Sequence, residues 1–217
     1  MVDLSSGDPS GEPEWAAFNR AETSPLTACT EIYRQKPEAP ESQRDIRVVD
    51  SGTISMAIGF PALAAARAAE AGAGPDEALA AALDVGRRTT IYATLTTLKY
   101  LAMSGRVGHL AAGLAGVLDV RPILTVRDGK LQMLERVRTR ARSWARLLEL
   151  TRTFLAGRQP QELAVLHVTA EREAAALSAE LVQALETDVQ PIIAELTPGL
   201  SVHGGPGMLG IAVVAQA

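Results

Sequence analysis

Hydrophobic positions in the middle of the chain predict two consecutive helices. Leu95, Leu98 and Leu101 recur at helical spacing, so the first segment would bury one face of a helix. Gly105 would end this helix, because glycine adopts the left-handed conformation of a helix C-terminus without steric penalty. A second helix, rich in Gly and Ala, is expected over 107–118.

The remaining hydrophobic runs alternate between strand-like and helix-like patterns. Strands are predicted at 46–49, 89–93, 120–126, 131–137, 163–168, 189–195 and 211–214, with an Asp128-Gly129 hairpin turn after the third. Helices are predicted at 59–71, 75–85, 140–155 and 170–185, the last capped by Thr169. Pro191 would confine its strand to a sheet edge, because proline cannot donate a ladder hydrogen bond.

This alternation indicates an α/β protein with a layered sheet. We expect it to divide into a small N-terminal lobe, residues 1–75, and a larger C-terminal lobe, residues 76–217. The 47% hydrophobic content is ordinary for a globular protein of 217 residues and provides enough apolar surface for real cores.

Composition and charge exclude several function classes. Aromatic residues make up only 4% of the chain and the net charge is −4, which argues against a nucleic-acid partner. The single cysteine, Cys29, cannot form an internal disulfide or a Cys-based metal site. The N-terminal residues show no secretory pattern, and the longest uncharged run, 51–66, is too short to cross a bilayer. We therefore expect a cytoplasmic protein without integral membrane association, metal or organic cofactor.

A central segment joins three unlike elements in a fixed order. It reads Leu98-x-x-Leu101-x-x-x-Gly105-Arg106-Val107, followed by a small-residue helix, Arg121-Pro122-Ile123-Leu124 and Asp128-Gly129. This order resembles the central signature of the DegV family of bacterial fatty-acid-binding proteins. The resemblance implies a two-lobe α/β fold with layered sheets and helices packed on both lobes. It also implies one long-chain fatty acid in a tunnel between or within the lobes.

Asp50, Ser51, Ser55 and Gly59 have the spacing of the family's Asp-Ser-x-x-x-Ser-x-x-x-Gly segment, which marks the junction between the lobes. Without the resemblance, this segment reads as a strand-to-helix turn in which Asp and Ser cap backbone donors.

The resemblance also assigns hydroxyls to the fatty acid head group. Ser24 and Thr27 lie in a segment similar to the family's Thr-Ser-x-Pro loop, whose hydroxyls receive the carboxylate. A carboxylate at the mouth of an apolar tunnel must keep its hydrogen bonds, because losing them would cost several kcal/mol. On the residues alone, either hydroxyl could equally cap the next helix.

Near the C-terminus, His203-Gly204-Gly205-Pro206-Gly207 resembles the family's His-x-Gly-Pro-Gly loop. By this likeness His203 would hydrogen-bond the carboxylate, directly or through another side chain. Gly205 and Gly207 would let the backbone approach the ligand or the other lobe at the lobe junction.

Two arginines match basic positions of the family. Arg138 would be a supporting donor to the head group, and Arg106 would lie on a partner-facing surface. Arginine suits such roles because its fork presents several donors at once. Without the resemblance, a charge run of this kind is usually a solvated helix face.

The resemblance implies a carrier, not an enzyme, whose partner is an ATP-dependent fatty acid kinase that phosphorylates the exposed carboxylate. The family's first strand and its serine-rich loop have no counterpart in place, so the N-terminal lobe is abridged. Two alternatives stay open. One is a phosphotransfer subunit resembling the dihydroxyacetone kinase substrate domain, which would form a covalent adduct at His203. The other is a degenerate interaction module that binds no lipid.

Overall fold

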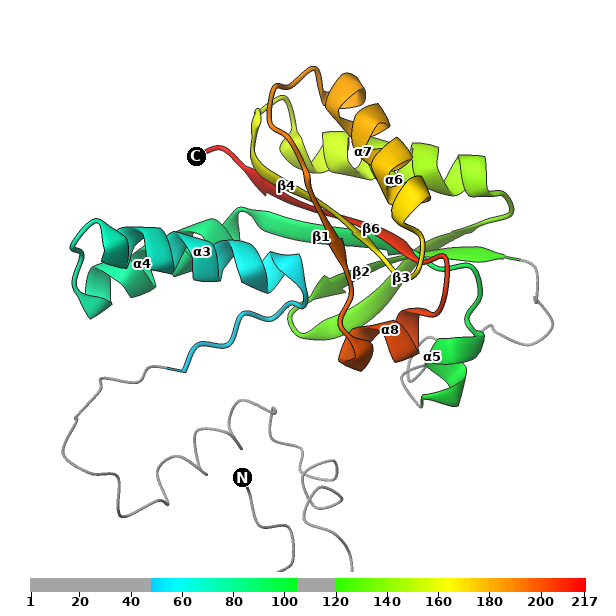
Figure 1. Cartoon of the computed structure of the whole chain (residues 1–217), viewed down its shortest axis with the longest axis horizontal. Helices are drawn as coiled ribbons and strands as arrows, with labels where there is room; N and C mark the ends of the chain where they lie inside the picture. Colours follow the sequence, from blue (N-terminus) through cyan, green and yellow to red (C-terminus); the bar gives the residue numbers. More distant parts are fainter. Residues whose placement is uncertain (1–47, 105–119) are drawn as a thin grey trace, which may run out of the picture. The chain divides into compact units, whose positions relative to one another are not determined.

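A single mixed sheet is the framework of the computed structural model, which describes residues 48–104 and 120–217 (Figure 1). Residues Ser51–Ala217 form one compact unit. In the described part of the chain the sheet has six strands in the order β3-β2-β1-β6-β4-β5, and of their pairings only β4–β5 is parallel. The strands are β1 (Thr89–Thr94), β2 (Arg121–Arg127), β3 (Lys130–Val137), β4 (Pro160–His167), β5 (Ile192–Glu195) and β6 (Leu209–Ala215).

Within the described residues, six helices connect and cover these strands. They are α3 (Met56–Glu70), α4 (Pro75–Arg87), α5 (Lys99–Met103), α6 (Arg140–Leu155), α7 (Glu171–Leu185) and α8 (Pro198–Gly204). The start of α6 follows from Thr139, whose side chain accepts a hydrogen bond from the Arg142 amide. Helix α4 begins with Pro75, and the Glu77 carboxylate accepts the Gly74 amide at 2.9 Å.

The two faces of the sheet carry different helices. Alternate strand residues such as Tyr92 and Ile211 pack against α6 and α7 in one apolar cluster. On the opposite face Ile91 and Ala212 pack against Phe60 of α3. A third cluster on that face lies beneath α5 and α8, and its buried members are Leu95, Leu101, Leu124, Val168 and Met208.

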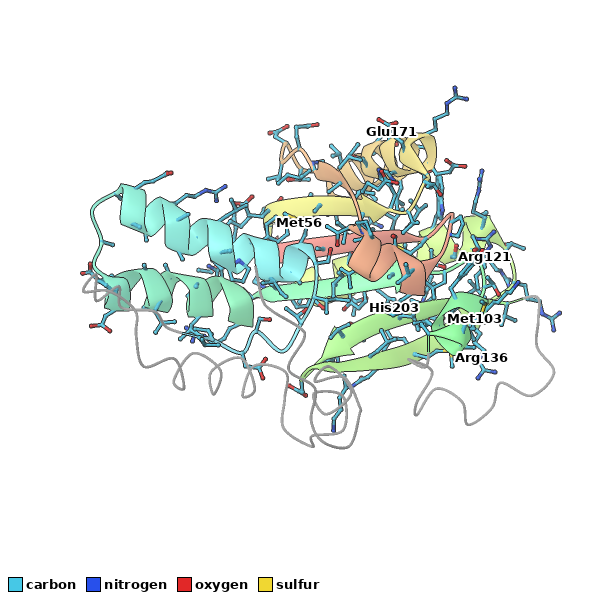
Figure 2. All side chains as sticks on the ribbon, turned by 60° about the horizontal axis from the view of Figure 1, so that its bottom comes forward. Met56, Met103, Arg121, Arg136, Glu171 and His203 are labelled. Carbon is cyan, nitrogen blue, oxygen red and sulfur yellow. The ribbon has the colours of Figure 1, made fainter. Side chains whose placement is uncertain are left out.

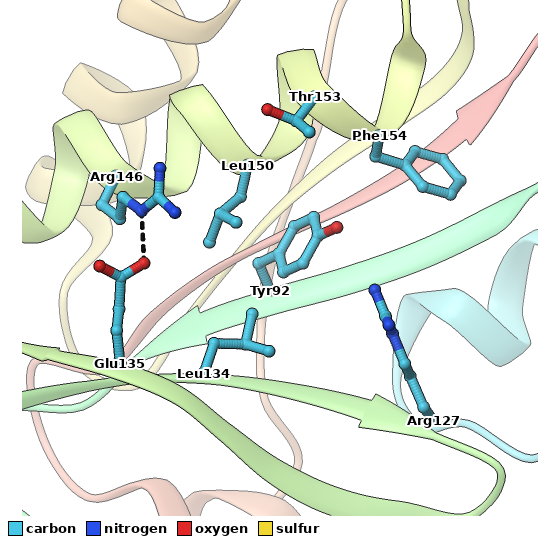
Figure 3. A pocket seen from close by; sticks show the side chains of 8 residues that line it. All are labelled: Tyr92, Arg127, Leu134, Glu135, Arg146, Leu150, Thr153 and Phe154. Carbon is cyan, nitrogen blue, oxygen red and sulfur yellow. Dashed lines mark hydrogen bonds and ion pairs between the residues drawn. The ribbon is translucent and has the colours of Figure 1, made fainter.

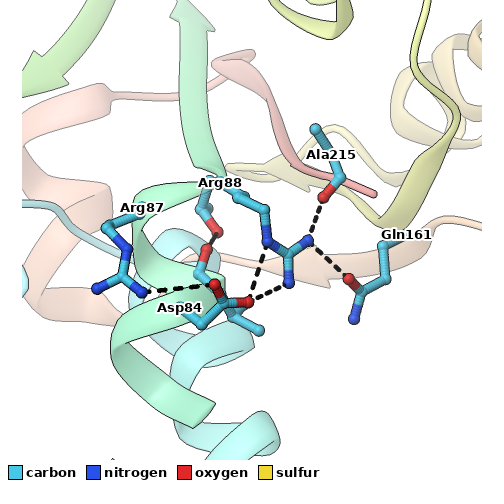
Figure 4. Close-up of polar contacts among 7 residues, drawn as sticks. Asp84, Arg87, Arg88, Gln161 and Ala215 are labelled. Atoms are coloured by element: carbon cyan, nitrogen blue, oxygen red, sulfur yellow. Dashed lines mark hydrogen bonds and ion pairs between the residues drawn. The ribbon is translucent and has the colours of Figure 1, made fainter. Parts of the chain in front are cut away.

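Arg88 ties the end of α4 to the strands of the sheet (Figure 4). Its guanidinium donates to Asp84 on α4, to the Gln161 side chain at 2.8 Å, and to the Ala215 carbonyl of β6. The hydrogen bond from Arg88 lowers the pKa of Asp84. The Arg88 guanidinium therefore joins α4, β4 and β6, three elements that are distant in sequence.

Most of the predicted elements are confirmed. The hairpin of β2 and β3, helix α6 and the edge position of β5 agree with the sequence analysis, and β5 starts directly after Pro191. Both residues of the hairpin turn, Asp128 and Gly129, have positive φ. The helix predicted over 107–118 lies outside the described residues, as does most of the N-terminal lobe, so the division at residue 75 stays a prediction.

Three local predictions were wrong. Val48 and Val49 belong to no strand. Helix α5 starts at Lys99 and not near Leu95, because the Leu95 amide still donates to Pro122 of β2. Thr169 does not cap α7: its φ is 46° and its own amide is bound by the Glu195 carboxylate at 3.1 Å.

Candidate functional site

The two signature segments of the sequence meet at one end of the sheet. Strands β1 and β6 are antiparallel neighbours, and Thr94 at the end of β1 pairs with Leu209 at the start of β6. The chain leaves β1 toward α5 and enters β6 from α8, so these two short helices come into contact (Figure 1). We call this junction, with the connecting residues 204–208, the α5/α8 corner.

Two glycines of the corner are required by their surroundings. Gly205 has φ 71° and ψ 167°, and a Cβ there would lie 2.1 Å from Cδ2 of Tyr100. Gly207 has φ 76°, and its Cβ would lie 2.8 Å from Cγ2 of Thr96. The Tyr100 ring therefore lies against the bare backbone of the glycine loop, a contact that any side chain at Gly205 would prevent.

Hydrogen bonds fix the loop on both sides. The Thr96 hydroxyl donates to the Pro206 carbonyl at 3.0 Å, and the Gly207 amide donates to the Val168 carbonyl at 2.9 Å. The Val168 amide in turn donates to Met208 at 3.1 Å. The loop is thus held between the segment that precedes α5 and the end of β4, which leaves its backbone little freedom.

His203 occupies the last turn of α8 and is half-buried. Large apolar side chains lie exposed on the two helices of the corner: Met103 of α5 is 74% exposed and Val202 of α8 is 58% exposed. Figure 2 shows His203 and Met103 at the same end of the molecule. A polar group, exposed apolar side chains and the third cluster beneath them together suit a ligand that has both a polar and an apolar part.

The other predicted site residues are placed as follows. Arg138 is exposed just after β3. Strands β2 and β1 lie between β3 and β6, the strand that follows the glycine loop of the α5/α8 corner. The Ser51 hydroxyl accepts the Thr53 amide at 3.4 Å, and the carbonyl of Ser55 accepts the first amides of α3. The Gly52 carbonyl accepts the Gly129 amide at 2.8 Å, which puts this segment at the hairpin turn and hence at the opposite ends of the strands from His203.

Ser24, Thr27 and Arg106 lie outside the described residues, and Asp50 is exposed at their boundary. Sequence reasoning missed Tyr100, which stands in the signature segment, and Thr96, which lies two residues before it. It also passed over Arg136. This residue pairs with Pro122, and the next residue, Ile123, faces α6. Strand alternation therefore places Arg136 on the opposite face, which carries α5 and α8.

Two classes of site find no support in the described part of the chain. Residues 48–104 and 120–217 contain no group of three or more His, Cys, Asp or Glu side chains placed to hold a metal ion. Within the same ranges no helix has the length and apolar character needed to cross a membrane.

Comparison with known proteins gives consistent matches. The family model described as "Uncharacterised protein, DegV family" matches residues 22–216. A DegV domain-containing protein of Streptomyces coelicolor is 39% identical over 178 residues, which is 82% of this chain and 63% of the relative. The chain therefore spans less than two thirds of that relative's length.

Solved structures agree with this match. The crystal structure of a DegV family protein from Corynebacterium glutamicum superposes with a TM-score of 0.76 at 27% identity, covering 89% of this chain and 69% of the other. That of DegV from Bacillus subtilis, described as a fatty acid binding protein, gives a TM-score of 0.69 at 27% identity, with coverage of 79% and 61%.

Proposed function

This chain belongs to the DegV family, and from that premise we propose that it binds one long-chain fatty acid at the α5/α8 corner. One observation carries the proposal. The two segments that give the chain its family likeness are packed into a single structure by the contact of Tyr100 with Gly205. The related protein of Bacillus subtilis is a fatty acid binding protein, which supports the same ligand class for this chain.

The apolar part of the ligand would be stabilised by the surface around the third cluster. Met103 and Val202 present exposed apolar side chains there, above a floor that includes Leu124 and Met208. Each buried methylene contributes about 0.8 kcal/mol. Affinity should therefore rise steeply with chain length.

The carboxylate would be held beside His203. A head group with fewer hydrogen bonds than it has in water would weaken binding, so several donors are needed. In the proposal Ser24 and Thr27 supply hydroxyls and Arg138 is a supporting cation. Arg136 is an additional candidate on the same face of the sheet.

We propose a carrier and not an enzyme. In this scheme a separate ATP-dependent kinase phosphorylates the presented carboxylate, and Arg106 contributes to the surface that the kinase contacts. The scheme is tested by incubating the lipid-loaded protein with candidate kinases and ATP and measuring acyl phosphate. Absence of acyl phosphate with every kinase would refute the carrier scheme while leaving lipid binding intact.

Lipid binding itself is tested by native mass spectrometry of freshly purified protein, followed by lipid extraction. We expect one co-purifying acyl species per chain. Titration with octanoic and hexadecanoic acid should give far tighter binding of the longer acid, whereas equal affinities would contradict an apolar binding site. His203→Gln should weaken hexadecanoic acid binding. The matched control is His167→Gln, since His167 is buried at the end of β4 and accepts the Ala170 amide.

A further inference from the structure

A groove of about 620 Å³ opens on the face of the sheet that carries α6, opposite the face of the α5/α8 corner (Figure 3). Helix α6 forms one wall, and strands β1, β2 and β3 form the floor. Its lining residues are Tyr92, Arg127, Leu134, Glu135, Arg146, Leu150, Thr153 and Phe154. The volume is in the range of pockets that hold small organic molecules.

Tyr92 gives the groove a hydroxyl without a hydrogen-bond partner among the described residues. The residue is only 4% exposed, and its ring belongs to the apolar cluster beneath α6. Its hydroxyl points into the groove and makes no hydrogen bond within residues 48–104 and 120–217 (Figure 3). The hydroxyl oxygen still reaches solvent in the groove, so a ligand there can form a hydrogen bond with it.

The two arginines of the groove differ in their pairing. Arg146 is bound by Glu135 and, at 2.6 Å, by Glu149, and these hydrogen bonds raise the pKa of Arg146. Arg127, at the end of β2, forms no ion pair with any described residue. Its guanidinium extends toward the side of the groove on which the Tyr92 hydroxyl lies. The groove therefore has one neutralised end and one end with an uncompensated positive charge.

The space between these ends is apolar. Leu134 of β3 is 38% exposed, and the half-buried side chain of Leu150 points toward it from α6 (Figure 3). The half-buried Phe154 lies farther along α6, on the side of Arg127. A ligand that satisfied only the charged groups would leave this apolar surface in water. A ligand with an apolar body would cover it and gain the corresponding burial.

We propose that the groove is a second binding site, which takes a small organic carboxylate with an aromatic or short aliphatic body. The carboxylate accepts hydrogen bonds from Arg127 and from the Tyr92 hydroxyl, and the body lies between Leu134 and Leu150. A guanidinium suits a carboxylate because two of its N–H groups match the two oxygens. A doubly charged phosphate would keep one negative charge uncompensated, because Arg127 is the one lining cation that forms no ion pair with a described residue.

The test is a chemical-shift titration of the ¹⁵N-labelled full chain with 3-phenylpropanoate, with 3-phenylpropan-1-ol as the uncharged probe and phenyl phosphate as the doubly charged one. We expect saturable shifts in β1, β3 and α6 with the carboxylate. Arg127→Gln should weaken binding by about tenfold or more, and Tyr92→Phe by about fivefold, since each removes a hydrogen bond to a charged group. Arg142→Gln, an exposed position of α6 outside the groove, is the matched control and should leave binding unchanged.

Several outcomes would overturn the second site. Equal binding of the alcohol, tighter binding of phenyl phosphate, or unchanged affinity in Arg127→Gln would each refute carboxylate recognition. Displacement of the probe by one equivalent of hexadecanoic acid would show that the groove is the fatty acid site and not a second one. His203→Gln should leave probe binding unchanged, so the groove and the lipid site at the corner can fail independently.

Discussion

The substitution Gly205→Ala tests the contact on which the α5/α8 corner depends. The backbone of Gly205 has φ 71° and ψ 167°, a region that only glycine occupies at low cost. An added Cβ would also lie 2.1, 2.5 and 2.8 Å from three ring atoms of Tyr100. Two separate penalties therefore act at one residue, and they can be separated by changing Tyr100.

The magnitudes follow from typical costs. A non-glycine residue in this backbone region costs about 1–3 kcal/mol, and overpacking against a ring that must move costs about 1–3 kcal/mol more. Gly205→Ala should thus lower the free energy of unfolding by roughly 4 kcal/mol. In a Tyr100→Ala background only the backbone penalty remains, so the same substitution should cost about 1–3 kcal/mol.

Urea denaturation of the four proteins of this double-mutant cycle measures the coupling. Two further variants are controls. Gly199→Ala lies in α8, the helix that ends just before Gly205; no atom lies within 4 Å of its Cβ, so it should not destabilise the protein. Gly72→Ala has φ 90° with open space around its Cβ, so it should show backbone strain alone. An identical cost of Gly205→Ala with and without the Tyr100 ring would refute the packing argument. The affinity of Gly205→Ala for hexadecanoic acid should fall as well, because the added Cβ displaces the Tyr100 ring from the α5/α8 corner.

Three further predictions concern stability. Thr139→Ala removes the side-chain cap of α6 and should cost about 1 kcal/mol in urea unfolding; no change in the midpoint would show that the cap contributes nothing. Leu147→Ala empties a fully buried position and should cost about 2–5 kcal/mol, against clearly less for the half-buried neighbour Leu148. The hydrogen bond from Arg88 lowers the pKa of Asp84 in the folded protein. The ion pair therefore stabilises the fold fully above the ordinary aspartate pKa of about 3.9, and this stabilisation is lost as the pH falls through the lower folded-state pKa. Asp84→Asn should accordingly be less stable than the parent at pH 7, and the gap should close in acid; a gap independent of pH would contradict this.

The elements that the sequence predicted well are those with long periodic patterns. Helix α6 has sixteen residues with a clear apolar face and a Thr139 cap, and its bounds agree with the prediction. The hairpin of β2 and β3 is marked by Asp128-Gly129, whose turn geometry is local. Such features depend on neighbouring residues, which is why periodicity and turn chemistry found them.

The corner was predicted only in part, because its geometry arises from contacts distant in sequence. Helix α8 has seven residues and leaves no periodic pattern, and α5 is shortened because Leu95 continues the pairing of β1 with β2. The need for glycine at Gly205 comes from Tyr100, more than a hundred positions earlier. The family likeness pointed to both segments, but nothing in the sequence showed that they touch.

The position of β6 in the sheet has a consequence for synthesis of the protein. This strand lies between β1 and β4, yet its residues are translated after all the other described strands. Until residue 215 leaves the ribosome, the described strands can form only the β3-β2-β1 group and the β4-β5 pair, each with an unpaired edge where β6 will lie. Closure of the sheet is therefore a late, long-range step, of the kind that makes folding slow.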